Sequence, residues 1–407
     1  MHAPQPAIKA PMWLLVLITL NGTAAMHMFV PALPAAADSL GVGSAAMQAA
    51  ISLYIVGLAV GQLIYGPLSD GWGRRPLLLF GLALYTLAGA WAFTAGDVTT
   101  LVGARLLQAL GGCAGLALGR AMVRDVSAGG DAVRNLALLN VMIMIGPGIA
   151  PLLGAQLSAL FNWRSIFLLL SGIGLVTLVC SWRLLPETGK PSGQVSARAV
   201  AVDYATLFRT RSFLGFALGG GCTTTSIYAF IAAAPFIFVE QLHRSLQEVG
   251  LYLALLIIGM SLGNLLTRRL ARSVPVERML IGGNLLCLLS AGAFLAVELS
   301  GATSVVHILG VMFFFTLGAG LTSPAAMTKA LSVDTHLIGS AAGFYGFSQM
   351  AVGALCTTAV GFLSNPALAA ATVLLGASLL GQLGFWAALQ GERKGAKARS
   401  RPCQNPT

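Results

Sequence analysis

The sequence predicts an all-α membrane protein in which twelve transmembrane helices form two six-helix bundles. Three observations support this fold class. Only 9% of the 407 residues are charged and 57% are hydrophobic, whereas soluble domains carry about 25% charged residues. The apolar residues gather in runs of about 20, the length of helix that crosses a bilayer. The longest polar stretch, residues 186–210, lies halfway along the chain. A soluble enzyme is therefore excluded.

Each apolar run is predicted as one membrane span. Six runs precede the polar stretch and six follow it. This layout predicts an N-terminal bundle over 1–185, a cytoplasmic linker over 186–210, and a C-terminal bundle over 211–407 that ends in a short basic tail. The predicted spans are 12–33, 45–66, 75–94, 99–122, 134–158, 164–185, 211–238, 247–268, 277–298, 303–327, 336–363 and 367–389.

The first span has a competing interpretation. Lys9, the apolar run that follows it and the small residues Ala35 to Ala37 are similar to a signal peptide with its cleavage site. The apolar segment continues to about Val30, which is longer than the apolar region of a signal peptide, and prolines lie close to the site. We therefore expect an uncleaved first helix.

The basic residues predict the orientation. With the N-terminus inside, 20 of the 24 Lys and Arg residues fall in inner loops and tails, and only Arg164 and Arg244 fall in outer loops. Cytoplasmic loops retain Lys and Arg, so both termini are expected in the cytoplasm. The net charge of +11 is then explained by topology, and we expect no nucleic-acid partner.

The loop between the second and third spans carries the most specific motif. Its glycines suit a tight reversal between two helices, its arginines hold it on the inner side, and its aspartate can pair with an arginine. The motif residues are Gly66, Asp70, Gly73, Arg74 and Arg75. We expect Arg124 and Asp125, at the inner end of the fourth span, either to join Asp70 in an inner-face charge cluster or only to anchor the topology.

This loop resembles the signature loop of the major facilitator superfamily, Gly-x-x-x-Asp-x-x-Gly-Arg-Arg. The corresponding loop of the second half keeps Arg268, Arg269 and Arg272 but lacks the Asp-x-x-Gly core. The six-plus-six layout also agrees with this superfamily. The resemblance implies the major facilitator fold and a protein of the bacterial inner membrane.

Other stretches resemble one branch of that superfamily, the drug:proton antiporters of the bicyclomycin- and chloramphenicol-resistance family. These are Arg105 to Gly111 in the fourth span, Gly146 to Gly154 in the fifth, and Phe29 to Pro34 in the first. The glycines and prolines of the fifth span should bend it, and the resemblance associates them with closing a leak path. They are Gly146, Pro147, Gly148, Pro151 and Gly154.

Two ionisable residues are predicted deep in the N-terminal half. An arginine inside a span usually faces a cavity or a partner, and the resemblance ties Arg105 to proton coupling; the alternative is that it extends to the outer headgroups. His27 lies four residues before Pro31, where the resembled family carries an aspartate. Because histidine titrates near neutral pH, His27 is a candidate for proton coupling, with substrate recognition or a neutral, hydrogen-bonded role as alternatives.

The resemblance places the first, fourth, seventh and tenth spans around a central cavity. Their candidate lining is largely aromatic, Met and Thr, which suits amphipathic molecules. The candidates besides His27 and Arg105 are Asn21, Thr23, Met28, Gln108, Cys113, Thr224, Tyr228, Phe230, Phe236, Phe314, Phe315 and Thr316.

These features predict a secondary active transporter that exports small organic compounds in exchange for protons. A permease for one metabolite, with altered or no proton coupling, is the alternative. An enzyme is not expected, because we find no carboxylate pair, metal-ligand cluster or nucleophile–base pattern. We expect no cofactor, no metal and a monomer. The six cysteines are scattered, which predicts apolar packing and no disulfide.

Overall fold

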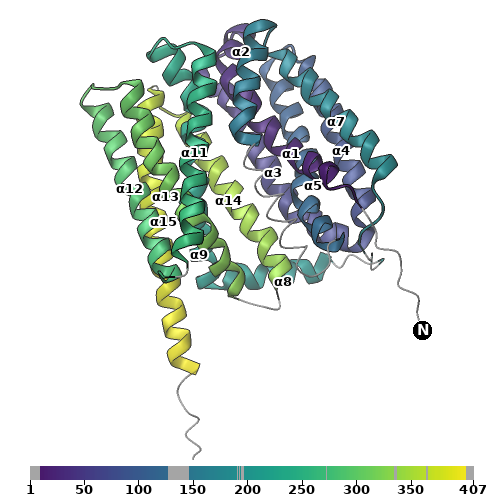
Figure 1. The fold of residues 1–407 in the computed structure, drawn as a ribbon, viewed down its shortest axis with the longest axis vertical. Helices are drawn as coiled ribbons and strands as arrows, with labels where there is room; N and C mark the ends of the chain where they lie inside the picture. The colour runs from purple at the N-terminus through teal and green to yellow at the C-terminus, as the bar shows by residue number, and fades with distance from the viewer. Residues whose placement is uncertain are drawn as a thin grey trace, which may run out of the picture.

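A computed structural model describes residues 10–126, 146–189, 191, 193, 197–271, 273–333, 337–363 and 365–399. Every regular element in these ranges is helical, and the helices stand side by side in one elongated bundle (Figure 1). The helix α8 (Ala197–Arg209) lies across one end of this bundle. We call the end that carries α8 and Gly73 the linker end.

The N-terminal half comprises the helices before α8. Its first span is α1 (Met12–Phe29), which continues through the 3-10 turn η1 (Val30–Ala32) into α2 (Leu33–Leu40) and stops where Gly41 has a φ of 65°. The first span is therefore longer than the predicted 12–33. The others are α3 (Ser44–Trp72), α4 (Arg74–Phe93), α5 (Val98–Val126), helical residues 146–160 and α7 (Arg164–Leu184).

The C-terminal half follows α8. Its first span is broken into α9 (Arg211–Thr224), α10 (Ile227–Pro235) and the π-helix η2 (Phe236–Gln241). It continues with α11 (Leu246–Leu270), α12 (Val276–Leu299), α13 (Val305–Ser332), α14 (Ile338–Val360) and α15 (Pro366–Arg399). The helix α15 extends past the predicted 389 and projects beyond its neighbours (Figure 1), since Ala, Glu, Lys and Arg favour helix.

Ten helical segments in the described part of the chain are long and apolar enough to cross a membrane. They match ten of the twelve predicted spans. The beginning of the predicted span 134–158 lies outside the described residues, and α14 is helical but is not among the ten. The prediction of a multi-span helical protein is confirmed, while the number twelve stays a prediction.

Helices of each half pack chiefly with one another, and the most extensive contact across the halves joins α3 and α14. Glycines permit the tightest approaches in the N-terminal half. A Cβ on Gly115 would overlap the carbonyl oxygen of Ile18, and one on Gly111 would overlap the backbone of Tyr85. The glycines of α5 therefore let it lie close to both α1 and α4.

Two elements differ from the sequence-based expectation. The helix α3 continues through Gly66 and Asp70 to Trp72, so the reversal is confined to Gly73, whose φ is 97°. Of the two glycines in the motif, only Gly73 has a backbone conformation that other residues avoid. The predicted linker contains α8, because its apolar residues recur at helical spacing: Leu207 is buried, and the ring of Tyr204 lies 5.8 Å from that of Phe344.

Candidate functional site

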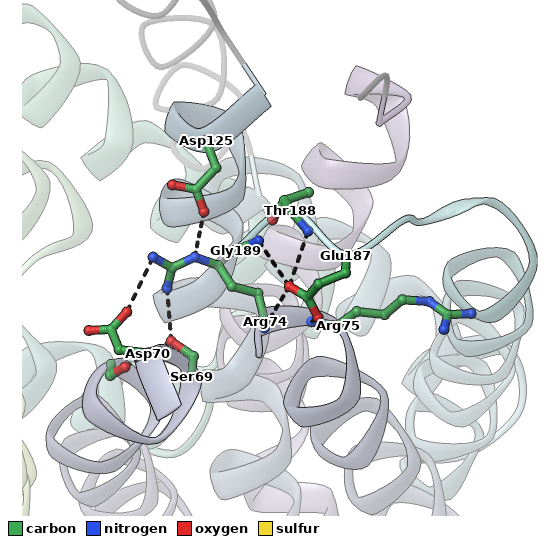
Figure 2. Close-up of polar contacts among 9 residues, drawn as sticks. Ser69, Asp70, Arg74, Arg75, Asp125, Glu187, Thr188 and Gly189 are labelled. Atoms are coloured by element: carbon green, nitrogen blue, oxygen red, sulfur yellow. Dashed lines mark hydrogen bonds and ion pairs between the residues drawn. The ribbon is translucent and has the colours of Figure 1, made fainter. Parts of the chain in front are cut away.

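The motif residues at the linker end form a network centred on Arg74 (Figure 2). Arg74 Nε donates to the carboxylate of Asp125, one terminal nitrogen lies 3.3 Å from Asp70, and the other donates to Ser69 Oγ at 2.8 Å. The guanidinium thus joins the ends of α3 and α5. The predicted inner-face cluster forms through Arg74, while the side chain of Arg124 lies outside the described part of the chain.

Glu187, which follows α7, completes this network and was not predicted (Figure 2). Its carboxylate accepts backbone N–H groups from Arg74 at 2.9 Å and Arg75 at 3.1 Å, which are the first residues of α4. It also accepts the N–H groups of Thr188 and Gly189. A carboxylate at a helix N-terminus meets N–H groups that have no partner inside the helix and the positive end of the helix dipole. Glu187 therefore fastens the end of α7 to the start of α4.

Arg105 is fully buried in the N-terminal half. One terminal nitrogen donates to the carbonyl of Ala25 at 3.0 Å and to Gln108 Oε1 at 2.8 Å. The guanidinium carbon lies 3.9 Å from the ring centre of Tyr54 and within 6 Å of two phenylalanine rings, a cation–π arrangement. Arg105 therefore does not extend to the headgroups; it is enclosed by aromatic rings of its own half.

His27 faces the other half of the chain. It is 6% exposed, and its ring lies 6.2 Å from that of Tyr228 on α10. His27 Nδ1 lies 2.9 Å from the carbonyl oxygen of Thr23. Because a carbonyl only accepts hydrogen bonds, Nδ1 carries the proton and Nε2 is the nitrogen that can accept one. The side chains of His27 and Arg105 share no hydrogen bond or ion pair in the described structure.

These two residues are exceptional in their burial. Within the described ranges, His27 and Arg105 are the only buried residues among the His, Lys, Arg, Asp and Glu side chains. No described aspartate or glutamate is buried.

The other predicted cavity residues do not share one location. Gln108 bonds to Arg105, and Cys113 donates to the carbonyl of Leu58 on α3. In the C-terminal half, Phe230, Phe236 and Phe315 are fully buried, whereas Phe314 is 52% exposed. Tyr228, opposite His27, is the member that meets the other half. The remaining positions are Asn21, Met28, Thr224 and Thr316, which are buried, and Thr23, which is partly buried.

The glycine-proline segment lies where the halves meet. Residues 146–160 remain helical through Pro151. A Cβ on Gly154 would overlap the carbonyl oxygen of Met28 on α1, and a Cβ on Gly250 of α11 would lie 3.0 Å from the carbonyl oxygen of Pro151. Small residues therefore allow close packing across the halves here. The bend that these glycines and prolines predict stays a prediction, because the part of the span before residue 146 lies outside the described ranges.

A second charged cluster at the linker end was also missed. Lys329 on α13 lies 2.6 Å from Glu277 on α12 and 3.0 Å from Glu392 on α15. Lys329 is more than 50 positions from either glutamate, and no local motif connects the three residues. Tyr54, whose ring lies against Arg105, is another residue that the sequence analysis missed. Its polar ring within an apolar run was a weak indication that it contacts a polar group.

The sequence matches the Major Facilitator Superfamily over residues 14–357. Among similar proteins, Multidrug resistance protein D of Escherichia coli (strain K12) is 30% identical over 83% of this chain and 84% of its own length. The Chloramphenicol resistance protein of Pseudomonas aeruginosa is 29% identical over 93% of this chain and 92% of its length. The Bicyclomycin resistance protein homolog of Haemophilus influenzae is 24% identical over 87% and 89%.

Solved structures are similar in fold. An inward-facing, unoccupied bacterial homolog of the human lysosomal transporter Spinster superposes with a TM-score of 0.74 at 14% identity, covering 98% of this chain and 100% of the other. A D-xylose-proton symporter gives a TM-score of 0.70 at 16% identity, covering 93% and 96%. At these identities the likeness concerns the fold alone.

Proposed function

The chain belongs to the Major Facilitator Superfamily, and from that premise we propose that it exports small amphipathic organic compounds, including drugs, in exchange for protons. Three similar proteins are named for resistance to bicyclomycin, to chloramphenicol or to many drugs. Their similarity covers more than four fifths of the chain in each case. Members of this superfamily are transporters. For this chain we propose which compounds are moved, in which direction, and that protons are exchanged for them.

The position of His27 carries the proposal of proton exchange. It is buried between α1 and Tyr228 of the other half, and Nε2 is free to accept a proton while Nδ1 bonds to Thr23. Protonation places a positive charge at the contact between the halves. Arg105 acts on this site indirectly, because it holds the carbonyl of Ala25, two residues before His27. We assign the transported proton to His27 and a positioning role to Arg105.

Alternating access would proceed by rocking of the N-terminal and C-terminal halves about the contact between α3 and α14. The linker end carries Arg74, Arg75, Arg209 and Lys329, and positively charged loops stay in the cytoplasm. We therefore place the linker end and both termini on the cytoplasmic side of the bacterial inner membrane. The protein is proposed to act as a monomer.

The proposal is tested with full-length protein in liposomes that carry an imposed pH gradient. Wild type should move a panel of amphipathic drugs, chloramphenicol included, against their gradient, and collapse of the pH gradient should stop this movement. His27→Gln keeps a side chain that can hydrogen bond but cannot titrate near neutral pH. It should lose gradient-driven uptake while still equilibrating drug across the membrane.

The matched control is Tyr228→Phe, which keeps the ring opposite His27 and should retain pH-driven transport. His27→Asp should restore part of the coupling, since a carboxylate also carries a proton. If His27→Gln transports as wild type does, the proton does not pass through His27. If no drug moves under any gradient, a permease for a single metabolite replaces the proposed exporter.

A further inference from the structure

The polar cluster around Arg105 contains hydrogen-bond donors that have no partner in the described structure. Arg105 uses both hydrogens of one terminal nitrogen, but its Nε and its second terminal nitrogen have no acceptor. Gln108 Nε2, the Tyr85 hydroxyl and the Ser171 hydroxyl are also buried and unpartnered. Buried polar groups are nearly always hydrogen bonded. We therefore expect these donors to have a partner other than the side chains described.

These atoms belong to one region. Gln108 bonds directly to Arg105, and Gln108 Nε2 and Ser171 Oγ both lie within 3 Å of the point where a Cβ on Gly89 would stand. The Tyr85 ring packs between α5 and α7, 3.3 Å from a Cβ placed at Gly112 and within 3 Å of one placed at Gly174, one helical turn from Gln108 and Ser171 respectively. The cluster therefore joins α4, α5 and α7, and only a residue without a side chain fits at Gly89, because a Cβ there would clash with both groups.

The missing partner must accept hydrogen bonds, because the unpartnered nitrogens can only donate. It should also be negative. A buried guanidinium without a counterion is unfavourable, and the described N-terminal half buries no carboxylate that could neutralise Arg105. The faces of the aromatic rings offset only part of this cost. A water molecule would satisfy the donors and leave the charge uncompensated.

We propose that Arg105, Gln108, Tyr85 and Ser171 form a buried binding site for a small monovalent anion, for which chloride is the physiological species. Arg105, Gln108 and Tyr85 are fully buried and Ser171 is 8% exposed, so only a small ion suits the site. The bound anion supplies the internal negative charge that this chain's own side chains do not. It thereby stabilises the packing of α4, α5 and α7 around Arg105.

The test compares the thermal unfolding of full-length protein in detergent in sodium chloride and in sodium gluconate at equal ionic strength. Binding to the folded state alone raises the midpoint, and we expect chloride to raise it by about 3–6 °C. Crystals grown in bromide should show its anomalous signal beside Arg105. Equal midpoints in the two salts, or a water molecule in place of bromide, would overturn the proposal.

Variants connect the effect to this site. Arg105→Met should abolish the chloride-dependent shift, whereas Asn284→Leu, in the core of the other half, should lower the midpoint in both salts and keep the shift. Tyr85→Phe keeps the ring and removes one donor, so about tenfold more chloride should be needed for half of the shift. A full shift in Arg105→Met, or an unchanged chloride dependence in Tyr85→Phe, contradicts the assignment. If Arg105→Met does not fold, the chloride dependence of Tyr85→Phe and the anomalous signal of bromide still test whether the anion binds here.

Discussion

The two halves of the chain close their linker ends with opposite arrangements of charge. In the N-terminal half a cation at the start of α4, Arg74, pairs with the anion Asp125 at the end of α5. In the C-terminal half an anion at the start of α12, Glu277, pairs with the cation Lys329 at the end of α13. Each half adds a second carboxylate: Glu187, which follows α7, and Glu392, which lies within α15. Both halves therefore use three charged residues at corresponding places. The cation and the anion at the first two places are exchanged between the halves.

The polar clusters in the two cores differ more deeply. In the C-terminal half the Asn284 amide is fully bonded: it accepts from Thr223 at 2.6 Å and donates to the carbonyl of Ser378 at 2.9 Å and to Gln382 at 2.7 Å. This network is neutral. In the N-terminal half the network around Arg105 is charged and lacks acceptors. The comparison indicates that the Asn284 amide is satisfied by its own neighbours, whereas the network around Arg105 needs a partner.

The helices α5 and α13 repeat this contrast at their N-termini. Asp97 caps α5, and its carboxylate accepts the backbone N–H of Thr100 at 2.8 Å and the Thr100 hydroxyl at 2.7 Å. Ser304 caps α13 with a neutral hydroxyl that accepts the N–H of His307 at 3.3 Å. The N-terminal half thus uses a charge where its counterpart uses a neutral group. We expect substitutions in the N-terminal half to depend more strongly on ions and pH.

The largest difference between the two halves is expected when the central cation of each linker-end cluster is exchanged between arginine and lysine. Arg74 contacts Asp70, Asp125 and Ser69 with different nitrogens, and lysine cannot reproduce that geometry. Arg74→Lys should lower the rate of drug export about tenfold or more, while Lys329→Arg should stay within about twofold, because arginine can still reach both glutamates. Initial rates in liposomes at matched protein content measure this. Equal losses in the two variants would show that geometry does not distinguish the clusters.

The second difference concerns the cores. Asn284→Ala leaves Gln382 Oε1 without its donor and Thr223 Oγ1 with the carbonyl of Gly219 alone, and it should lower the free energy of unfolding by about 2–3 kcal/mol. Arg105→Met removes a charge that has no counterion, so in chloride-free buffer it should be neutral or stabilising. Denaturation in detergent, followed by tryptophan fluorescence, measures both. A strong destabilisation by Arg105→Met in gluconate would contradict the view that the charge is uncompensated.

A smaller difference in stability is expected between the two carboxylates Glu187, which follows α7, and Glu392, which lies within α15. Glu187 accepts four backbone N–H groups, whereas Glu392 meets the single cation Lys329 near the surface. Glu187→Gln replaces one acceptor oxygen by a donor and should destabilise by about 1 kcal/mol. Glu392→Gln should have a smaller effect. Thermal midpoints of the two variants decide; a larger loss in Glu392→Gln would reverse the comparison.

The smallest effect is expected at the two helix caps. The hydrogen bonds from Thr100 hold the pKa of the Asp97 carboxyl below its ordinary value. A lowered pKa means that this contribution to stability is full above the ordinary pKa and is lost as the pH falls through the lowered one. Asp97→Asn should therefore show a slightly smaller loss of thermal midpoint between pH 6 and pH 3 than wild type. Ser304→Asn, the neutral counterpart, should leave that pH dependence unchanged.

The sequence predicted the helical membrane architecture because hydropathy is a local property. Runs of apolar residues had to become spans, and Gly73 had to mark a turn, whatever the remaining packing was. The sequence also offered an inner-face cluster of Asp70, Arg124 and Asp125, whereas in the structure Arg74 joins Asp70 to Asp125. By contrast, α8 was missed, because a short amphipathic helix in a polar stretch gives a weak signal.

The sequence alone determined that this chain is a multi-span helical membrane protein and that its described spans carry almost no charge; the side on which its basic residues lie stays a prediction. Only the tertiary structure decided which groups meet. It placed His27 against Tyr228 of the other half, enclosed Arg105 among rings with unpartnered donors, and brought Glu187 to the start of α4. The physical reason is that hydropathy acts residue by residue, whereas hydrogen bonds and ion pairs depend on distances between helices remote in sequence.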